Sequence, residues 1–294
     1  MPPVIPMNAN QFIEQQLDIQ AGELETACDS HLLSISGSLV AGVDDLVRRA
    51  VEGRAGSRQK KLTVLLTTAG GYIEIVQRMV DTLRHHYRVV DFIVPNYAFS
   101  AGTVLALSGD AIHMDYYSRL GPIDPQLERT AGRMVPALGY LIQWERLLAK
   151  AKDGTITLPE VQLMLEGFDQ AELYQYEQAR ELSISLVEEW LAKYKFKNWK
   201  MTETSHTKVT PTMRKTRAKA IASELNNTDR WHVHGHGISM EVLRRDLNLL
   251  IDDYEKDAAK AGLVKKYYGL LDDYMVKIGN GGMIHTVGAF QPYL

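Results

Sequence analysis

The stretch "NYAFSAGTVLALSGDAIHMD" (residues 96–115) places Ser100 among small residues, between an apolar β-type run and a helical one. Its neighbours Ala98, Ala101 and Gly102 leave room for a bulky substrate to approach the hydroxyl. A serine hydroxyl becomes a nucleophile when a base removes its proton. The stretch therefore indicates a nucleophilic serine; the alternative is a serine that only caps the following helix.

A second turn of small residues, "TTAGGY" (residues 67–72), lies one strand–helix–strand unit earlier. Backbone N–H groups at a helix start are unpaired and favour negative charge, and glycine lets a substrate approach them closely. Gly70 or Gly71 could thus donate to the oxyanion that forms when Ser100 attacks a carbonyl. Taken alone, the two glycines are also compatible with a tight turn.

Other catalytic motifs do not fit this chain. Ser100 lacks the glycine two residues before it that G-x-S-x-G requires, and Thr103 stands where S-x-x-K requires lysine. Neither G-x-x-x-x-G-K-[ST] nor G-x-G-x-x-G occurs, so the sequence offers no nucleotide-binding loop.

The elements that would position the two turns alternate between strand and helix. The patterns predict strands at 31–40, 61–68, 88–94 and 111–115, with helices at 43–53, 72–87 and 100–108. This order predicts an α/β fold with a mostly parallel sheet, whose functional loops lie at the carboxyl ends of the strands. Beyond about Pro125 the strand signal fades, and helices are expected at 158–194 and 240–261. We expect an N-terminal segment (1–29), an α/β core (30–157) and a helical second half (158–294).

Composition narrows the class of protein. The chain has 294 residues, a net charge of −3 and 45% hydrophobic residues, which is ordinary for a globular protein. Cys28 is the only cysteine, which excludes an intrachain disulfide scaffold or a cysteine-based zinc site. No apolar run reaches the roughly 18–20 residues that span a bilayer, and the N-terminus does not resemble a secretory signal. A cytoplasmic location is expected.

The combination of "LLTTAGG" (residues 65–71), "FSAGT" (99–103) and "LGPIDPQ" (120–126) resembles the Clp protease/crotonase superfamily, in its serine dehydrogenase proteinase branch, related to signal-peptide peptidase A. The resemblance implies peptide hydrolysis without a cofactor, with Ser100 as nucleophile and an oxyanion hole from the "TAGG" turn and the Ala101 amide. It also implies a peptide or protein substrate and assembly into homo-oligomers.

The sequence identifies the base that would accept the Ser100 proton less clearly than it identifies the nucleophile. Asp124 stands where the Clp proteases have a histidine, whereas relatives of signal-peptide peptidase A use a lysine about fifty residues after the serine. Lys152 lies 52 residues after Ser100, close to Lys150, and becomes a base if its pKa falls from its usual ~10.4. In the branch itself a lysine can stand on the long helix, but "YEQAREL" (176–182) has none. We predict Lys152, with His234 as the other candidate because "WHVHGHGIS" (231–239) echoes a family pattern.

The histidines are candidates for metal ligands or for structural residues. "HVHGHG" (232–237) could suggest a metal site, but no acidic residue or cysteine completes a ligand set nearby, so no metal is predicted. His113 is expected to be a buried, hydrogen-bonded histidine within the sheet.

A basic segment spans residues 193–219, with nine lysines and arginines against Glu203 alone, and with three aromatic residues interleaved. This composition is typical of a surface for single-stranded nucleic acid, and equally of a solvated loop and helix. The basic side chains are Lys193, Lys195, Lys197, Lys200, Lys208, Arg214, Lys215, Arg217 and Lys219. Three alternatives to a peptidase therefore stay open: a nucleic-acid-associated protein, a non-catalytic oligomeric scaffold, and an acyl-CoA enzyme on the same fold.

Overall fold

A seven-stranded sheet forms the centre of the computed structural model, which describes residues 7–54, 56, 59–123, 126–129, 133–231 and 235–294. The strand order is β10-β5-β3-β2-β1-β11-β12, and the first five run parallel. The strands are β1 (His31–Ser36), β2 (Lys61–Thr67), β3 (Val89–Ile93), β5 (Ala111–Met114), β10 (Asp252–Asp253), β11 (Gly282–Thr286) and β12 (Ala289–Tyr293). The predicted α/β fold with a mostly parallel sheet is confirmed.

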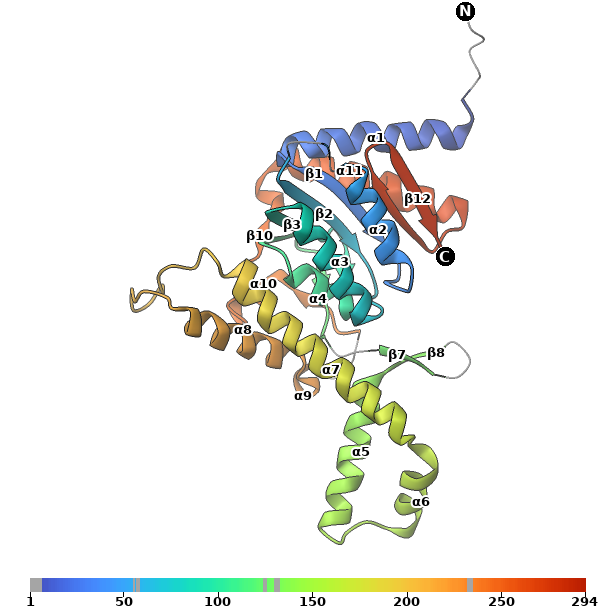
Figure 1. Ribbon diagram of the computed structural model, residues 1–294, viewed down its shortest axis with the longest axis vertical. Coiled ribbons are helices and arrows are strands. Elements are labelled where there is room, and N and C mark those ends of the chain that lie inside the picture. Colours follow the sequence, from blue (N-terminus) through green and yellow to red (C-terminus); the bar gives the residue numbers. More distant parts are fainter. Residues whose placement is uncertain (1–6, 55, 57–58, 124–125, 130–132, 232–234) are drawn as a thin grey trace, which may run out of the picture.

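Helices cover both faces of this sheet because its strands alternate buried side chains between the two (Figure 1). Leu32, Leu65 and Ile93 pack in one cluster with α1 (Ala9–Cys28) and α11 (Ala258–Ile278). The other face is covered by α2 (Val43–Glu52), α3 (Ile73–His86) and α4 (Ala101–Leu107). In the same hydrophobic cluster, α7 (Gln170–Trp190) packs on α3 and α4, and α8 (Pro211–Leu225) packs on α7.

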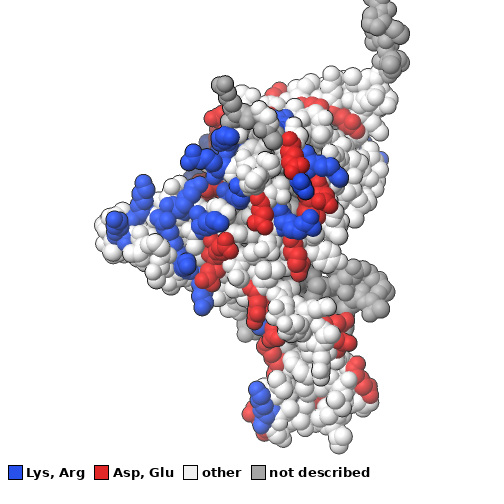
Figure 2. All heavy atoms as spheres, in the orientation of Figure 1, with Lys and Arg blue, Asp and Glu red and all other residues white. Residues whose placement is uncertain are grey.

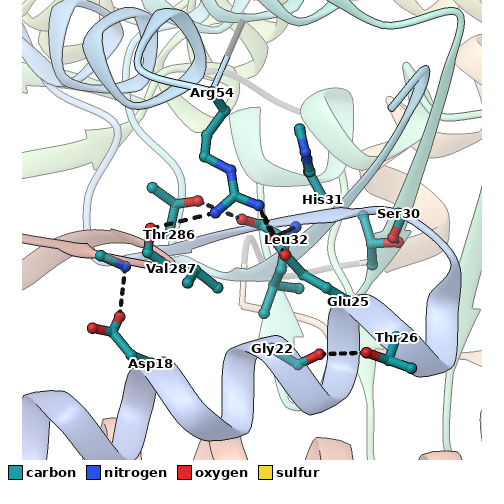
Figure 3. A network of polar contacts seen from close by, with 12 residues as sticks. Asp18, Gly22, Glu25, Thr26, Ser30, His31, Leu32, Arg54, Thr286 and Val287 are labelled. Atoms are coloured by element: carbon teal, nitrogen blue, oxygen red, sulfur yellow. Dashed lines mark hydrogen bonds and ion pairs between the residues drawn. The ribbon is translucent and has the colours of Figure 1, made fainter. Parts of the chain in front are cut away.

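Polar contacts hold α1 against the sheet (Figure 3). Arg54 donates to both carboxylate oxygens of Glu25 at 2.8 Å, and Glu25 also accepts the backbone N–H of Leu32 at 2.9 Å. Asp18, about two turns before Glu25 on α1, accepts the Gly288 N–H at 2.8 Å. Helix α1 is thus tied both to β1 and to the β11–β12 turn.

The second half of the chain holds strands that the sequence did not predict. The expectation that strands end near Pro125 is wrong: β10 extends one edge of the sheet, while β11 and β12 complete the other. The short pieces β4 (Tyr97–Ala98), β6 (Arg119–Leu120) and β9 (Ile238–Ser239) form a small second sheet beside Ser100, and β7 (Gln126–Arg129) pairs with β8 (Arg133–Pro136).

The helix predicted over 158–194 is interrupted. The chain forms α6 (Leu158–Gly167) and then α7, because Asp169 caps a new helix by accepting the N–H groups of Ala171 and Glu172. The helix expected at 240–261 is replaced by α10 (Met240–Arg245), β10, the 3₁₀ turn η2 (Tyr254–Lys256) and the start of α11. The π-helical turn η1 (Leu191–Lys195) ends α7, and the single turn α9 (Thr228–Trp231) follows α8.

Helices α5 (Ala137–Lys152) and α6 form an arm that projects away from the sheet (Figure 1). The arm leaves apolar side chains in solvent: Leu158 is 86% exposed and Leu165 is 79% exposed. Trp144 and Phe168 contact each other where the arm meets α7. Exposed leucines on a projecting arm suit contact with another protein surface.

His113, in β5, gives the fold a predicted dependence on pH. Burial, reinforced by the nearby Lys260 ammonium, lowers its pKa to about 4. The unfolded chain, with a histidine pKa near ~6.5, binds the proton more readily, so the free energy of unfolding should fall as pH drops from ~6.5 to about 4, by up to ~1.4 kcal/mol per pH unit. Urea unfolding at pH 7 and pH 5 measures this loss.

His113→Gln should reduce that loss between pH 7 and pH 5, because its amide does not titrate. The matched control is His85→Gln, on the exposed face of α3, which should keep the wild-type dependence. An unchanged dependence in His113→Gln would contradict the role of this partly buried histidine.

Candidate active site

The glycine turn after β2 is fixed between two neighbouring segments. Leu39 N–H donates to the Gly70 carbonyl and Tyr72 N–H donates to the Leu39 carbonyl, both at 2.9 Å. These are the two bonds of a parallel bridge between Leu39 and Gly71. Gly71 has a φ of 155°, and a Cβ on it would lie 2.2 Å from the Leu39 oxygen. Only glycine fits at this close approach of two backbones.

Ser100 lies at the sharp turn between β4 and α4. Its φ of 52° and ψ of −123° form a backbone conformation that non-glycine residues rarely adopt. Such conformations persist where the surroundings enforce them, and they cluster at functional sites. Although Ser100 occupies the N-cap position, its side chain makes no capping hydrogen bond to α4. The helix-cap interpretation of this serine is therefore wrong.

The two turns meet face to face. A Cβ on Gly70 would lie 2.8 Å from the Ser100 Cβ and 3.3 Å from its Oγ. A parallel bridge between Thr68 and Ala98 joins the segments that lead into them. Gly102 completes the fit, because a Cβ there would come within 2.3 Å of the Thr68 Cγ2. The small residues around Ser100 thus allow two strand ends to come together.

Two amides face the region around the serine. Leu39 is paired with Gly70 and Tyr72, so the N–H of Gly71, between them, points to the opposite side, where β4 and Ser100 lie. The Gly70 N–H is taken by the Thr68 Oγ1 at 3.0 Å. Ala101, the first residue of α4, has an N–H of the kind that a helix leaves unpaired within its own first turn. Of the two glycines, Gly71 is the better placed donor.

The site is closed in this structure. Ser100 is 1% exposed and Ala101 is 5% exposed. The room for a bulky substrate that the small neighbours of Ser100 predicted is therefore not open here, and a peptide can reach the hydroxyl only if the covering segments move. Exclusion of water also strengthens hydrogen bonds from backbone amides to a developing negative charge.

Lys152 is not brought to the serine within one chain. It is exposed and is the last residue of α5, at the end of the arm, whereas Ser100 lies in the core beside the sheet (Figure 1). Its neighbour Lys150 forms an ion pair with Glu160 of α6. The 52-residue spacing between Ser100 and Lys152 therefore does not bring the two side chains together within one chain.

Asp124 and His234, the other candidates for proton transfer, lie outside the described residues. His113 lies in β5 as predicted, but its side chain is only partly buried. Among the residues that the structure describes, no group of three or more histidine, cysteine or acidic side chains could hold a metal ion.

The basic segment 193–219 forms a charged surface, but its aromatic side chains pack inward. Figure 2 shows lysines and arginines gathered at the end of the molecule formed by α7, α8 and the loop between them. Phe196 is buried, Trp199 packs against the main core, and the Tyr194 ring lies 3.7 Å from the Arg84 guanidinium carbon. Nucleic-acid bases would find few of these rings available for stacking. Within the described part of the chain, no helix is long and apolar enough to cross a membrane.

Two curated relatives match part of the chain, and both are uncharacterized proteins of Methanocaldococcus jannaschii. One is 31% identical over 144 residues, covering 46% of this chain and 48% of its own. The other is 30% identical over 116 residues, covering 40% and 37%. The matches thus span about half of these relatives or less.

Two solved structures are also similar. A variant of the 1510-N membrane-bound stomatin-specific protease, in complex with a substrate peptide, has a TM-score of 0.46 and 15% identity, covering 88% of this chain and 84% of that one. ClpP1 from Listeria monocytogenes has a TM-score of 0.42 and 11% identity, covering 82% and 97%.

The family comparison covers the part of the chain that holds both turns. The model of the "ClpP-like SDH-type serine proteinase" family matches residues 40–167. This range includes the "TAGG" turn, Ser100 and the "LGPIDPQ" stretch, the residues on which the resemblance was based. The resemblance of this chain to the serine dehydrogenase proteinase branch of the Clp protease/crotonase superfamily is therefore confirmed.

Proposed function

We propose that this protein is a serine peptidase in which the Ser100 Oγ attacks the carbonyl carbon of a peptide bond. The observation that carries the proposal is the strained turn at Ser100, packed against Gly70. A buried serine in a disfavoured backbone conformation, with glycine opposite its side chain, suits a nucleophile better than a helix cap.

The reaction uses the two backbone amides identified above. As Oγ bonds to the carbonyl carbon, a base accepts the hydroxyl proton and the carbonyl oxygen becomes an oxyanion. The N–H groups of Gly71 and Ala101 donate to that oxygen, while the amine leaves with a proton. Water then hydrolyses the acyl-enzyme. One such donor contributes roughly 10²–10³-fold to the rate in related chemistry.

Labelling with a fluorophosphonate tests this proposal, because the reagent forms a covalent adduct only with an activated serine. Wild-type protein should be labelled at Ser100, as shown by peptide mass spectrometry. Ser108, equally buried at the other end of α4, is the internal comparison and should stay unlabelled. Absence of any adduct would contradict the peptidase proposal and favour a non-catalytic binding protein.

Lys152 remains our candidate for the base, and its position implies a partner copy. Because the arm projects away from its own sheet, Lys152 would have to serve the Ser100 of a second chain. The exposed leucines of α6 would be covered in such an assembly, which agrees with the expected homo-oligomer. Light scattering should show a species larger than the 33.1 kDa chain.

Mixing two inactive variants tests this arrangement. Ser100→Ala retains Lys152, and Lys152→Ala retains Ser100, so a mixed assembly rebuilds some complete sites. Half of the serines and half of the lysines survive in an equal mixture, which predicts about a quarter of the wild-type rate for a two-chain site. Each variant alone should be inactive. Full activity of Lys152→Ala alone would show that the base is another residue.

The pH–rate profile gives a second readout on the base. A lysine must be neutral to accept a proton, so a lysine base predicts a rate that rises toward alkaline pH. A histidine base, such as His234, would instead give a rise near pH ~6–7.

A further inference from the structure

Thr68 is the buried residue that contacts both turns of the candidate site. It directly follows β2 and is 1% exposed. Its backbone N–H donates to the Tyr97 carbonyl at 3.0 Å, and its carbonyl accepts the Phe99 N–H at 2.9 Å. The end of β2 is thus tied to the segment that leads into Ser100.

The Thr68 side chain contacts both turns. Its Oγ1 accepts the Gly70 N–H at 3.0 Å and donates to the Gly70 carbonyl oxygen at 3.4 Å. Its Cγ2 occupies the space that a Cβ on Gly102 would need, 2.3 Å from that ideal position. The hydroxyl therefore holds the glycine turn, while the methyl group packs against the helix that begins after Ser100.

We propose that Thr68 is a positioning residue that sets the distance between the Gly71 amide and the Ser100 hydroxyl; this inference rests on the peptidase function proposed above. A buried N–H without an acceptor is costly, so without the Thr68 hydroxyl the Gly70 amide would rotate toward another acceptor. The adjacent Gly71 peptide would turn with it. The oxyanion would then lose a donor that the transition state needs more than the bound substrate does.

Two substitutions separate the hydroxyl from the rest of the side chain. Thr68→Val keeps the shape and loses the hydroxyl, whereas Thr68→Ser keeps the hydroxyl and loses the methyl group. Thr68→Val should lower kcat by roughly 10–100-fold and leave KM within about twofold, because the lost interaction belongs to the transition state. Thr68→Ser should retain kcat within about threefold. Equal kcat in Thr68→Val and wild type, or equal losses in both variants, would overturn the proposal.

Thr63→Val is the matched control. Thr63 lies in β2, five residues before Thr68, is 2% exposed, and its hydroxyl shares a 2.6 Å hydrogen bond with Ser30. The substitution removes an equally buried hydroxyl far from Ser100, so it should lower Tm without changing kcat. A fall in kcat as large as that of Thr68→Val would show that loss of any buried hydroxyl in β2 is enough, and would also overturn the proposal.

Amide hydrogen exchange measures how firmly the Thr68 hydroxyl holds the glycine turn, whether or not the protein is a peptidase. If wild-type protein shows neither hydrolysis nor labelling, the exchange rates of Gly70 and Gly71 still measure the stability of that turn. Exchange there should be at least about tenfold faster in Thr68→Val than in Thr68→Ser. Equal protection in the two variants would refute the role of the hydroxyl. If Thr68→Val does not fold, Thr68→Ala replaces it, since it differs from Thr68→Ser only by the hydroxyl.

Discussion

A Ser100→Ala variant should fold and assemble as the wild type does and lose peptidase activity by about 10⁴-fold or more, because no other group supplies the attacking oxygen. Hydrolysis of a fluorogenic peptide by purified protein measures the loss. Ser108→Ala is the control, because Ser108 has the same burial and lies at the C-terminal end of the same helix. It gives up the hydrogen bond to the Leu105 carbonyl and should cost about 1 kcal/mol of stability with activity retained.

The strained backbone gives this prediction a second part that does not depend on activity. Alanine retains a Cβ and so keeps the disfavoured φ of 52°, whereas glycine relieves it. Ser100→Gly should therefore be more stable than Ser100→Ala, by roughly 1 kcal/mol, in urea unfolding. Hydrolysis by Ser100→Ala at the wild-type rate would show that Ser100 is not the nucleophile. Equal stability of the two variants would show that the backbone at Ser100 is not strained.

Sequence patterns predicted the pair of turns because both depend on local signals. β2 and β3 are apolar runs of the kind that a parallel sheet buries, and the small residues after them stand out against those runs. Once two parallel strands are neighbours, their carboxyl ends must lie side by side. The approach of Gly70 to Ser100 follows from those two facts.

The features that the sequence missed depend on contacts between distant segments. β10 is two residues long and forms only because its backbone pairs with β5, so no periodicity could identify it. The positive φ of Ser100 is one that serine rarely adopts, so it could not be predicted from the residue type. Thr68 stands in the "TAGG" turn, but the sequence did not distinguish its role from that of the glycines, since this role depends on the Gly70 N–H and on the space at Gly102.

The Lys152 prediction illustrates a different limit. A separation of 52 residues along the chain does not determine how far Lys152 lies from Ser100 in space. Helix α5 projects from the core and carries Lys152 away from its own Ser100. The interleaved aromatics of the basic segment show the same effect. Their spacing suggested an exposed stacking surface, but the fold uses Phe196 and Trp199 to anchor the end of α7 to the core.

Gly71→Ala should be the most damaging single substitution in the glycine turn. The new Cβ would lie 2.2 Å from the Leu39 oxygen and 2.6 Å from its carbonyl carbon, and neither backbone atom can move without breaking the bridge between the segments. We expect a loss of roughly 3 kcal/mol or more in the free energy of unfolding. The displaced Gly71 amide should also lower kcat by about 10²–10³-fold in the protein that remains folded.

Gly262→Ala is the control for this prediction. Gly262 lies on the exposed side of α11, where an added Cβ would meet nothing within 4 Å. Alanine favours the helix there, so the variant should gain roughly 0.5–1 kcal/mol with kcat unchanged. Urea unfolding gives the stabilities, and active-site titration with the fluorophosphonate normalises kcat to the folded fraction. Wild-type stability and kcat in Gly71→Ala would mean that this turn does not press against Leu39, and its amide could no longer be assigned to the oxyanion.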